Sequence, residues 1–102
     1  MIHDYKGHYP YSAEIIENWD STSIGVYYCG YKTQENKLIP LYIGKGAGEG
    51  GMRSRLLDHL REDNWPDITH FGYRTCDTEA ETEELEKTEI AKYKPRYNHQ
   101  GK

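Results

Sequence analysis

Two hydrophobic stretches separated by a polar segment stand out in the first half of the chain. Residues 24–30 are rich in β-branched and aromatic side chains, and residues 37–43 repeat this composition after the polar residues 33–36. Such stretches are typical of β-strands, and their short spacing predicts an antiparallel hairpin. Pro40 lacks the N–H group that a central strand needs, which indicates a sheet edge or a bulge.

Side chains alternate between the two faces of a strand. Applied to the hairpin, this rule places the aliphatic side chains on one face, and Tyr27 and Tyr42 on the other. The aliphatic set is Ile24, Val26, Ile39, Leu41 and Ile43. The two tyrosine rings then either face a cleft or pack beneath a helix, and the pattern leaves both possibilities open.

The remaining pattern predicts helices and one further strand. A helix is predicted over 52–62, with an apolar arc formed by Met52, Leu56, Leu57 and Leu60. The sequence Asn64-Trp65-Pro66 ends this helix. Residues 68–76 alternate as a third strand. Thr78 followed by Glu81 forms a capping box that starts the last helix, and Ser12 is the N-cap of a possible short helix near the N-terminus.

These elements predict an α+β fold (α/β in the broad sense) in the order β-β-α-β-α. We expect a small antiparallel three-stranded sheet flanked by helices. Residues 23–102 form this domain, and residues 1–22 are an N-terminal extension that includes the possible short helix.

The glycine-rich segment 46–51 satisfies the pattern G-x-G-x-x-G of dinucleotide-binding proteins. That interpretation is rejected, because the preceding strand closes a hairpin and does not open a βαβ unit. We expect the glycines to supply positive φ angles and free N–H groups at the start of the following helix.

The last helix carries a glutamate on its packing face. At about 100° per residue, Leu85, Ile90 and Tyr93 fall on one arc, and Glu86 lies within it. A carboxylate in that position is costly unless it is paired or binds a cation. Glu89 also lies near the arc, but the periodicity favours Glu86.

Composition and charge restrict the possible functions. The formal net charge is −4, which argues against a protein that simply coats nucleic acid. Cations nevertheless gather around the glycine bend, where a local patch can steer a phosphate group. The two cysteines lack the spacing of a disulfide framework or a zinc site, so we expect free thiols. No apolar run reaches membrane-spanning length, and we expect a cytoplasmic protein without membrane contact.

The residue types with chemical potential occur in five motifs along the chain. They are Gly25-Val26-Tyr27, Tyr42-Ile43-Gly44-Lys45, Arg55 with His59 four residues later, the glutamate helix with Glu86, and Lys94-Pro95-Arg96-Tyr97-Asn98. In this order they resemble the GIY-YIG endonuclease family, which includes the nuclease domain of the bacterial excision-repair incision enzyme and homing endonucleases. The resemblance covers residues 23–99.

The resemblance implies hydrolysis of DNA phosphodiesters with Mg²⁺, for which Mn²⁺ substitutes. Glu86 would be the metal ligand, a lone carboxylate suited to an ion that keeps most of its waters. Arg55 would hold a non-bridging phosphate oxygen, and Asn98 would orient the site. Arg53 is the alternative arginine, because the segment between Tyr42 and Arg55 is longer than is usual in the family.

The same resemblance implies a tyrosine as general base for the attacking water. Tyr27 is the candidate and Tyr42 the alternative. A phenol with a pKa of about 10 needs nearby cations to ionise near neutrality, and Lys45 and His59 would provide them.

Two other functions remain open at the level of sequence. A degenerate, catalytically inactive relative would bind nucleic acid without cutting it, and a protein-interaction module would use the acidic face of the last helix. The chain has little surface for reading a long DNA site. It could recognise DNA shape, form a homodimer or depend on an accessory specificity partner.

Overall fold

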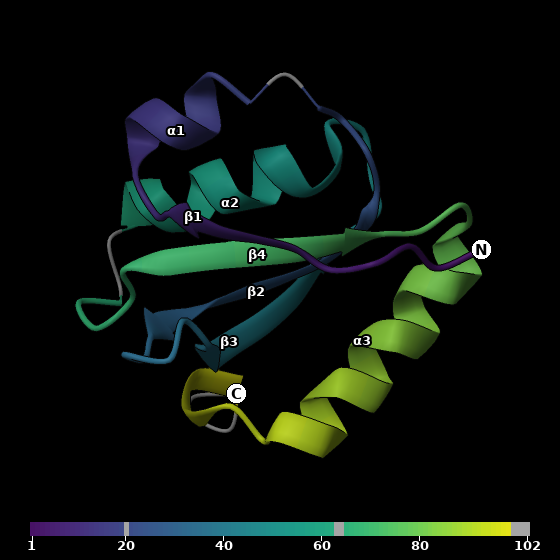
Figure 1. Cartoon of the computed structure of the whole chain (residues 1–102). Coiled ribbons are helices and arrows are strands. Elements are labelled where there is room, and N and C mark those ends of the chain that lie inside the picture. Colours follow the sequence, from purple (N-terminus) through teal and green to yellow (C-terminus); the bar gives the residue numbers. More distant parts are fainter. Residues whose placement is uncertain (20, 63–64, 99–102) are drawn as a thin grey trace.

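A four-stranded antiparallel sheet forms the centre of the fold (Figure 1). The computed structural model describes residues 1–19, 21–62 and 65–98. The strands are β1 (Lys6–Pro10), β2 (Gly25–Lys32), β3 (Leu38–Gly46) and β4 (His70–Thr75), in the spatial order β1-β4-β2-β3. The helices are α1 (Ala13–Glu17), α2 (Gly51–Glu62) and α3 (Glu79–Tyr93), followed by the short 3₁₀ helix η1 (Arg96–Asn98).

The prediction of an antiparallel α+β fold is confirmed, but the prediction of three strands is wrong. The additional strand is β1, which pairs with β4 and lies within the segment expected to be an N-terminal extension. Its sequence Lys-Gly-His-Tyr-Pro has no alternation of apolar and polar residues, and most of its side chains are exposed. An outer strand held by backbone hydrogen bonds leaves no hydrophobic signature in the sequence.

Each face of the sheet carries its own hydrophobic core. Helices α1 and α2 cover one face, and α3 crosses the other (Figure 1). The first core includes Tyr27, Leu56 and Phe71, whereas the second includes Val26 and Leu85. Within the described residues, none of the helices is both long and apolar enough to span a membrane.

The predicted separation of the hairpin faces is confirmed for Val26, Ile43 and the two tyrosines, but it is wrong at Leu41. Val26 and Ile43 pack under α3, whereas Tyr27 and Tyr42 belong to the opposite face. Leu41 joins the tyrosines because Cys29 pairs with Tyr42 but the next residue, Gly30, pairs with Pro40. This bulge beside Pro40 inserts one extra residue and reverses the alternation.

The local signals at helix ends are confirmed. Thr78 and Glu81 form the capping box of α3, and the Ser12 hydroxyl accepts a hydrogen bond from the Ile15 amide at the start of α1. At the start of α2, Gly50 and Gly51 both have positive φ angles, as the glycine-rich segment predicts. The expected free N–H groups are absent at Gly51 and Met52, because these amides donate to the Gly48 and Ser23 carbonyls. Both cysteines are free and buried.

Candidate functional site

The predicted site residues gather around β3, which is an edge strand of the sheet. Tyr42 and Lys45 belong to β3 itself, and Tyr27 lies on the paired strand β2 opposite Gly44. The other predicted residues come from three elements that pack against β3. Arg55 and His59 lie on α2, Glu86 on α3 and Asn98 on η1.

Tyr27 and His59 form a hydrogen-bonded pair beneath α2. The Tyr27 hydroxyl lies 2.8 Å from Nε2 of His59. Tyr27 has no exposed surface, so of the two sequence-based possibilities its ring packs beneath a helix and does not face an open cleft. Gly44 leaves room for this arrangement, because a Cβ there would lie 2.5 Å from the phenol oxygen. The third residue of the tyrosine-isoleucine-glycine motif therefore has a steric role.

Burial determines the protonation states of this pair. Desolvation raises the pKa of Tyr27, with the neighbouring Tyr42 adding to the rise and the Arg55 charge opposing it. Burial and the Arg55 charge both lower the pKa of His59. Near neutral pH the phenol is therefore protonated and the imidazole is uncharged. In this state His59 has a nitrogen lone pair available to accept a proton.

Trp65 is a site residue that the sequence interpretation missed. Its ring stacks on Tyr42 with a centroid distance of 4.6 Å and lies 4.4 Å from the His59 ring. Tyr97 adds a nearly parallel ring 6.2 Å away. Trp65 follows α2 outside any periodic pattern, so no sequence signal connected it to His59. The Trp65 ring therefore packs against the imidazole.

The two candidate arginines differ in their environments. Arg55 is about half exposed, and its only recorded ion pair within the described residues is with Asp58 at 3.7 Å. Its charge still reaches Tyr27, Tyr42 and His59, because it shifts the pKa of each. Arg53 instead donates a hydrogen bond to the Glu17 carbonyl of α1 at 2.8 Å. Arg55 is thus the arginine that faces the site.

Glu86 approaches β3 from the side of α3. Burial raises its pKa, Lys45 lowers it and Glu83 raises it further. Lys45 itself lies 3.6 Å from Glu83. Among the described residues, the Glu86 carboxylate has no recorded hydrogen bond or ion pair, and no three His, Cys, Asp or Glu side chains come together as a metal cage. A half-buried carboxylate with free lone pairs fits a Mg²⁺ ion that keeps most of its waters.

The most buried carboxylate of α3 is not Glu86, as the periodicity favoured, but Glu89. Glu89 is 9% exposed and accepts a hydrogen bond from the Tyr28 hydroxyl at 2.9 Å. The sheet lies obliquely across α3 (Figure 1), so a side chain at the margin of the apolar arc becomes the buried one. Its tyrosine partner comes from a strand 61 residues away in sequence, which periodicity does not detect.

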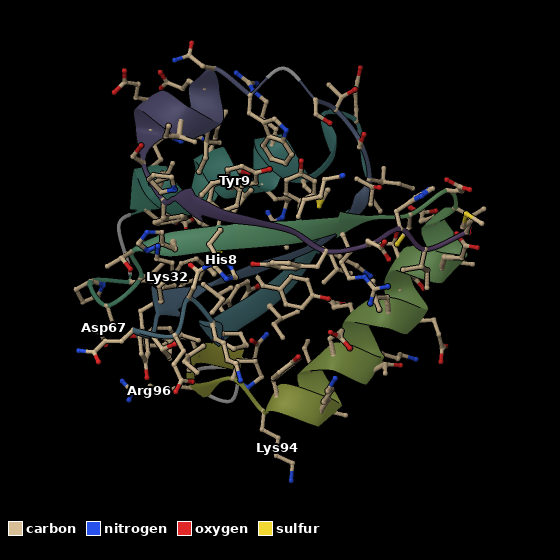
Figure 2. The ribbon with its side chains drawn as sticks, viewed as in Figure 1. His8, Tyr9, Lys32, Asp67, Lys94 and Arg96 are labelled. Carbon is tan, nitrogen blue, oxygen red and sulfur yellow. The ribbon has the colours of Figure 1, made fainter. Side chains whose placement is uncertain are left out.

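Asn98 attaches the C-terminal segment to the edge of the sheet. Its side chain accepts a hydrogen bond from the Ile43 amide at 2.8 Å and donates one to the Ile43 carbonyl at 2.9 Å. It therefore pairs with β3 beside Tyr42 as another strand would. Figure 2 shows Lys94 pointing away from the fold, whereas Arg96 extends toward Asp67, 3.4 Å away.

The site thus combines an uncharged imidazole, an exposed guanidinium and an unpaired carboxylate around one sheet edge. These groups suit proton acceptance, anion binding and cation binding, respectively. Comparisons of the chain with family models, with curated proteins and with solved structures found no match. Function is therefore inferred from the side chains and their geometry.

Proposed function

We propose that the protein is a metal-dependent DNA endonuclease that hydrolyses phosphodiester bonds at a GIY-YIG-type site on β3. The main support is the Tyr27–His59 hydrogen bond of 2.8 Å beside the exposed Arg55 guanidinium. A proton acceptor next to an anion-binding group is what hydrolysis of a phosphodiester requires. Glu86 adds the metal ligand from the other side of the same strand.

Arg55 binds the scissile phosphate in this proposal. Its guanidinium donates two parallel hydrogen bonds to non-bridging oxygens and balances the charge that develops on them. The ion pair with Asp58 is exposed and weak, so the phosphate readily displaces it. Lys45, on β3 itself, places a second positive charge near the DNA backbone.

His59 is the final proton acceptor. As the water oxygen attacks phosphorus and the bond to the leaving oxygen breaks, the water proton passes to the uncharged imidazole of His59, which is only partly buried. Tyr27 has no exposed surface, so it does not contact the water and instead holds the imidazole through the hydrogen bond of 2.8 Å. This assignment avoids a free phenolate, which the burial of Tyr27 disfavours. Tyr42 is the alternative residue for contact with the water, because it is only partly buried.

Glu86 would hold Mg²⁺ or Mn²⁺, which supplies Lewis-acid stabilisation of the leaving oxygen when bound. The rise in the pKa of Glu86 on burial shows that its carboxylate is poorly solvated. A cation relieves this desolvation. The single carboxylate leaves the remaining coordination positions to water and phosphate oxygens.

The test is cleavage of supercoiled and branched DNA with Mg²⁺ or Mn²⁺, with EDTA as a control. We compare Glu86→Gln with Glu84→Gln, an exposed glutamate on the same helix. Because one charge-stabilising group is lost, the cleavage rate should decrease by about 10²–10³-fold for Glu86→Gln. The cleavage rate of Glu84→Gln should not change. Thermal stability of Glu86→Gln should be unchanged or higher, because the carboxylate is desolvated and has no recorded hydrogen bond in the described part of the chain.

Each alternative gives a different result in this assay. A fully active Glu86→Gln would remove Glu86 from the chemistry. DNA that is bound but not cut on any substrate would favour the inactive nucleic-acid-binding module. If the protein neither binds nor cuts DNA, the proposal is refuted altogether.

A further inference from the structure

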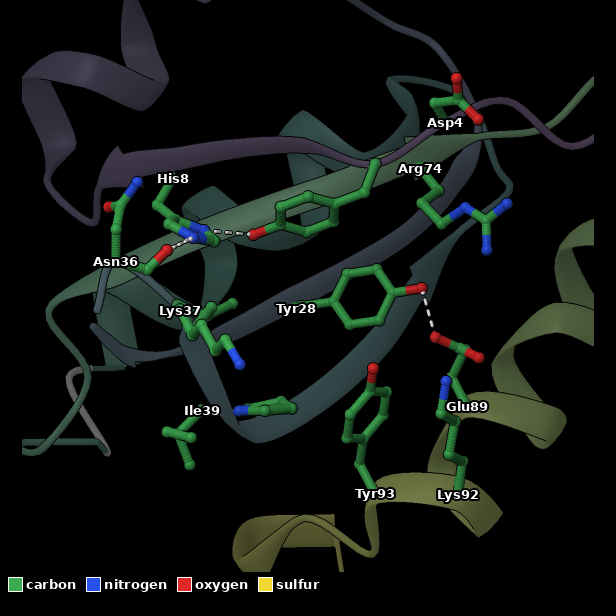
Figure 3. Close-up of a pocket in the computed structure, with 13 residues that line it drawn as sticks. Asp4, His8, Tyr28, Asn36, Lys37, Ile39, Arg74, Glu89, Lys92 and Tyr93 are labelled. Atoms are coloured by element: carbon green, nitrogen blue, oxygen red, sulfur yellow. Dashed lines mark hydrogen bonds between the residues drawn. The ribbon is translucent and has the colours of Figure 1, made fainter. Parts of the chain in front are cut away.

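A cavity lies on the sheet face opposite the Tyr27–His59 pair. Its volume is about 640 Å³, and it opens between β1, the β2–β3 turn and α3 (Figure 3). None of the predicted site residues lines it. This volume falls within the range of about 300–1,000 Å³ typical of small-molecule sites.

Aromatic rings form much of the cavity wall. Tyr28 projects from β2, and Tyr93 rises toward it from α3 (Figure 3). Tyr5 also lines the cavity, with its ring centroid 5.5 Å from that of Tyr28. Tyr93 is 44% exposed and Tyr5 is 37% exposed, whereas Tyr28 is buried. Exposed aromatic faces inside a concave wall are suited to stacking with a planar ring.

The wall is also fixed in position by hydrogen bonds. The Tyr5 hydroxyl lies 2.8 Å from Nδ1 of His8, and Nε2 of His8 lies 3.0 Å from the Asn36 carbonyl. These contacts connect β1 to the β2–β3 turn in the wall of the cavity. At its inner end, the buried Glu89 carboxylate accepts the Tyr28 hydrogen bond and has lone pairs left for another donor.

Positive charge exceeds negative charge in this wall, in contrast to the molecule as a whole. Lys37, Arg74 and Lys92 line the cavity together with two carboxylates, whereas the chain has a net charge of −4. In the part of the chain that the structure describes, none of these three cations has a recorded salt bridge. Lys37 extends from the side opposite Glu89, whereas Lys92 lies beside Glu89 (Figure 3), so Lys37 is the cation at the far end from that carboxylate.

We propose that this cavity binds a nucleotide. The planar base stacks among the tyrosines and donates an N–H group to Glu89, and the phosphate lies at the Lys37 end. A ligand with only an anion would leave the aromatic wall and Glu89 unused, and a neutral ring would leave the lysine uncompensated. The site does not depend on the proposed nuclease activity, because it shares no residue with that site. A free mononucleotide and the terminal nucleotide of a strand offer the same chemistry.

Calorimetric titration with adenosine 5′-monophosphate in EDTA tests the proposal, with adenosine and inorganic phosphate as separate probes. The monophosphate should bind more tightly than either probe. Lys37→Gln should weaken its binding about tenfold or more through loss of a charge-assisted hydrogen bond. Lys32→Gln is the matched control, because Lys32 is exposed at the end of β2 and does not line the cavity. It should leave binding unchanged.

Amide chemical shifts locate the binding. Shifts at Tyr28 and Tyr93 support the proposal, whereas shifts confined to Tyr42 and His59 would overturn it and indicate binding at the nuclease site. Adenosine binding as tightly as the monophosphate, equal effects of the two lysine variants, or absence of binding would each overturn it as well. A 5′-phosphorylated trinucleotide then distinguishes a free mononucleotide from the terminal nucleotide of a strand as the ligand. It should shift the same amides only if the cavity accepts the end of a strand.

Discussion

At the residue scale, the Tyr27–His59 pair shows how burial changes the role of a side chain. The phenol that resembles a general base is fully enclosed, and its pKa is raised. Its hydrogen-bond partner is an imidazole whose pKa is lowered. The group that can accept a proton near neutral pH is therefore the histidine, and the enclosed tyrosine holds it in position through their hydrogen bond.

The titration of His59 tests this reversal of roles. Burial and the Arg55 charge lower its pKa, so its NMR titration midpoint should lie below the ordinary value of about 6.5. Arg55→Gln should raise the midpoint while burial still keeps it below that value. Lys6→Gln, which removes a charge from β1, is the control and should leave it unchanged.

The same shift predicts the sign of the pH dependence of stability. The unfolded chain binds a proton on His59 at higher pH than the native protein does, so this residue destabilises the fold as the pH falls below about 6.5. A midpoint above 6.5 in the native protein would contradict both statements.

At the scale of elements, β3 organises the site because it is the edge to which α2, α3 and η1 all attach. An edge strand has free N–H and C=O groups along one side. Here the Asn98 side chain satisfies both groups of Ile43. The Asn98 side chain thus attaches the C-terminal segment to β3, in addition to the contacts of Arg96 and Tyr97 with Asp67.

Two substitutions of Asn98 should distinguish the contributions of its two hydrogen bonds to Ile43. Asn98→Ala loses both and should lower the free energy of unfolding by about 1–3 kcal/mol, measured by urea denaturation. Asn98→Asp keeps the acceptor for the Ile43 amide and should protect that amide from hydrogen exchange, whereas Asn98→Ala should not. Equal exchange of the Ile43 amide in both variants would show that the Oδ1 contact contributes nothing.

The entry into α2 offers a matched pair of glycines. Gly51 has a φ of 62°, and a Cβ there would lie 2.3 Å from the carbonyl oxygens of Thr22 and Ser23. Gly51→Ala should therefore destabilise the protein by more than about 2 kcal/mol, from left-handed strain and backbone clash. At Gly48 a Cβ meets nothing within 4 Å, so Gly48→Ala should change stability by less than about 0.5 kcal/mol. Similar urea midpoints for the two variants would contradict this account.

At the scale of the whole molecule, the acidic net charge and the local cations make opposite demands on DNA binding. The net charge of −4 repels a polyanion, and Lys45 and Arg55 are the cations that the proposed site presents to it. Binding should therefore be a local contact with few phosphates. It should not resemble the broad coverage of a basic DNA-binding domain.

The salt dependence of DNA binding measures the number of these contacts. Two neutralised phosphates predict a slope of about −2 for log K against log salt concentration, measured by fluorescence anisotropy in EDTA. Lys45→Gln should reduce the magnitude of the slope by about 1, and Lys6→Gln should not change it. A slope steeper than about −5 would show that the main cationic surface lies elsewhere on the molecule.

The sequence by itself determined the features that depend on neighbouring residues. The capping box at Thr78, the N-cap at Ser12, the glycine entry into α2 and the opposite faces of Val26 and Tyr27 all follow from spacings of a few residues. Such signals are local because helix ends and strand faces are defined by backbone geometry over one or two turns or pleats.

Only the tertiary structure decided which side chains meet. It added β1 to the sheet, reversed Leu41 at the bulge, buried Glu89 in preference to Glu86 and placed Trp65 on His59. Each depends on a partner far away in the chain, such as Tyr28 for Glu89 or β4 for β1. Hydrogen bonds and packing contacts between distant segments leave no periodic pattern in either segment. These contacts determine the protonation states and the solvent exposure of the side chains on which the proposed chemistry depends.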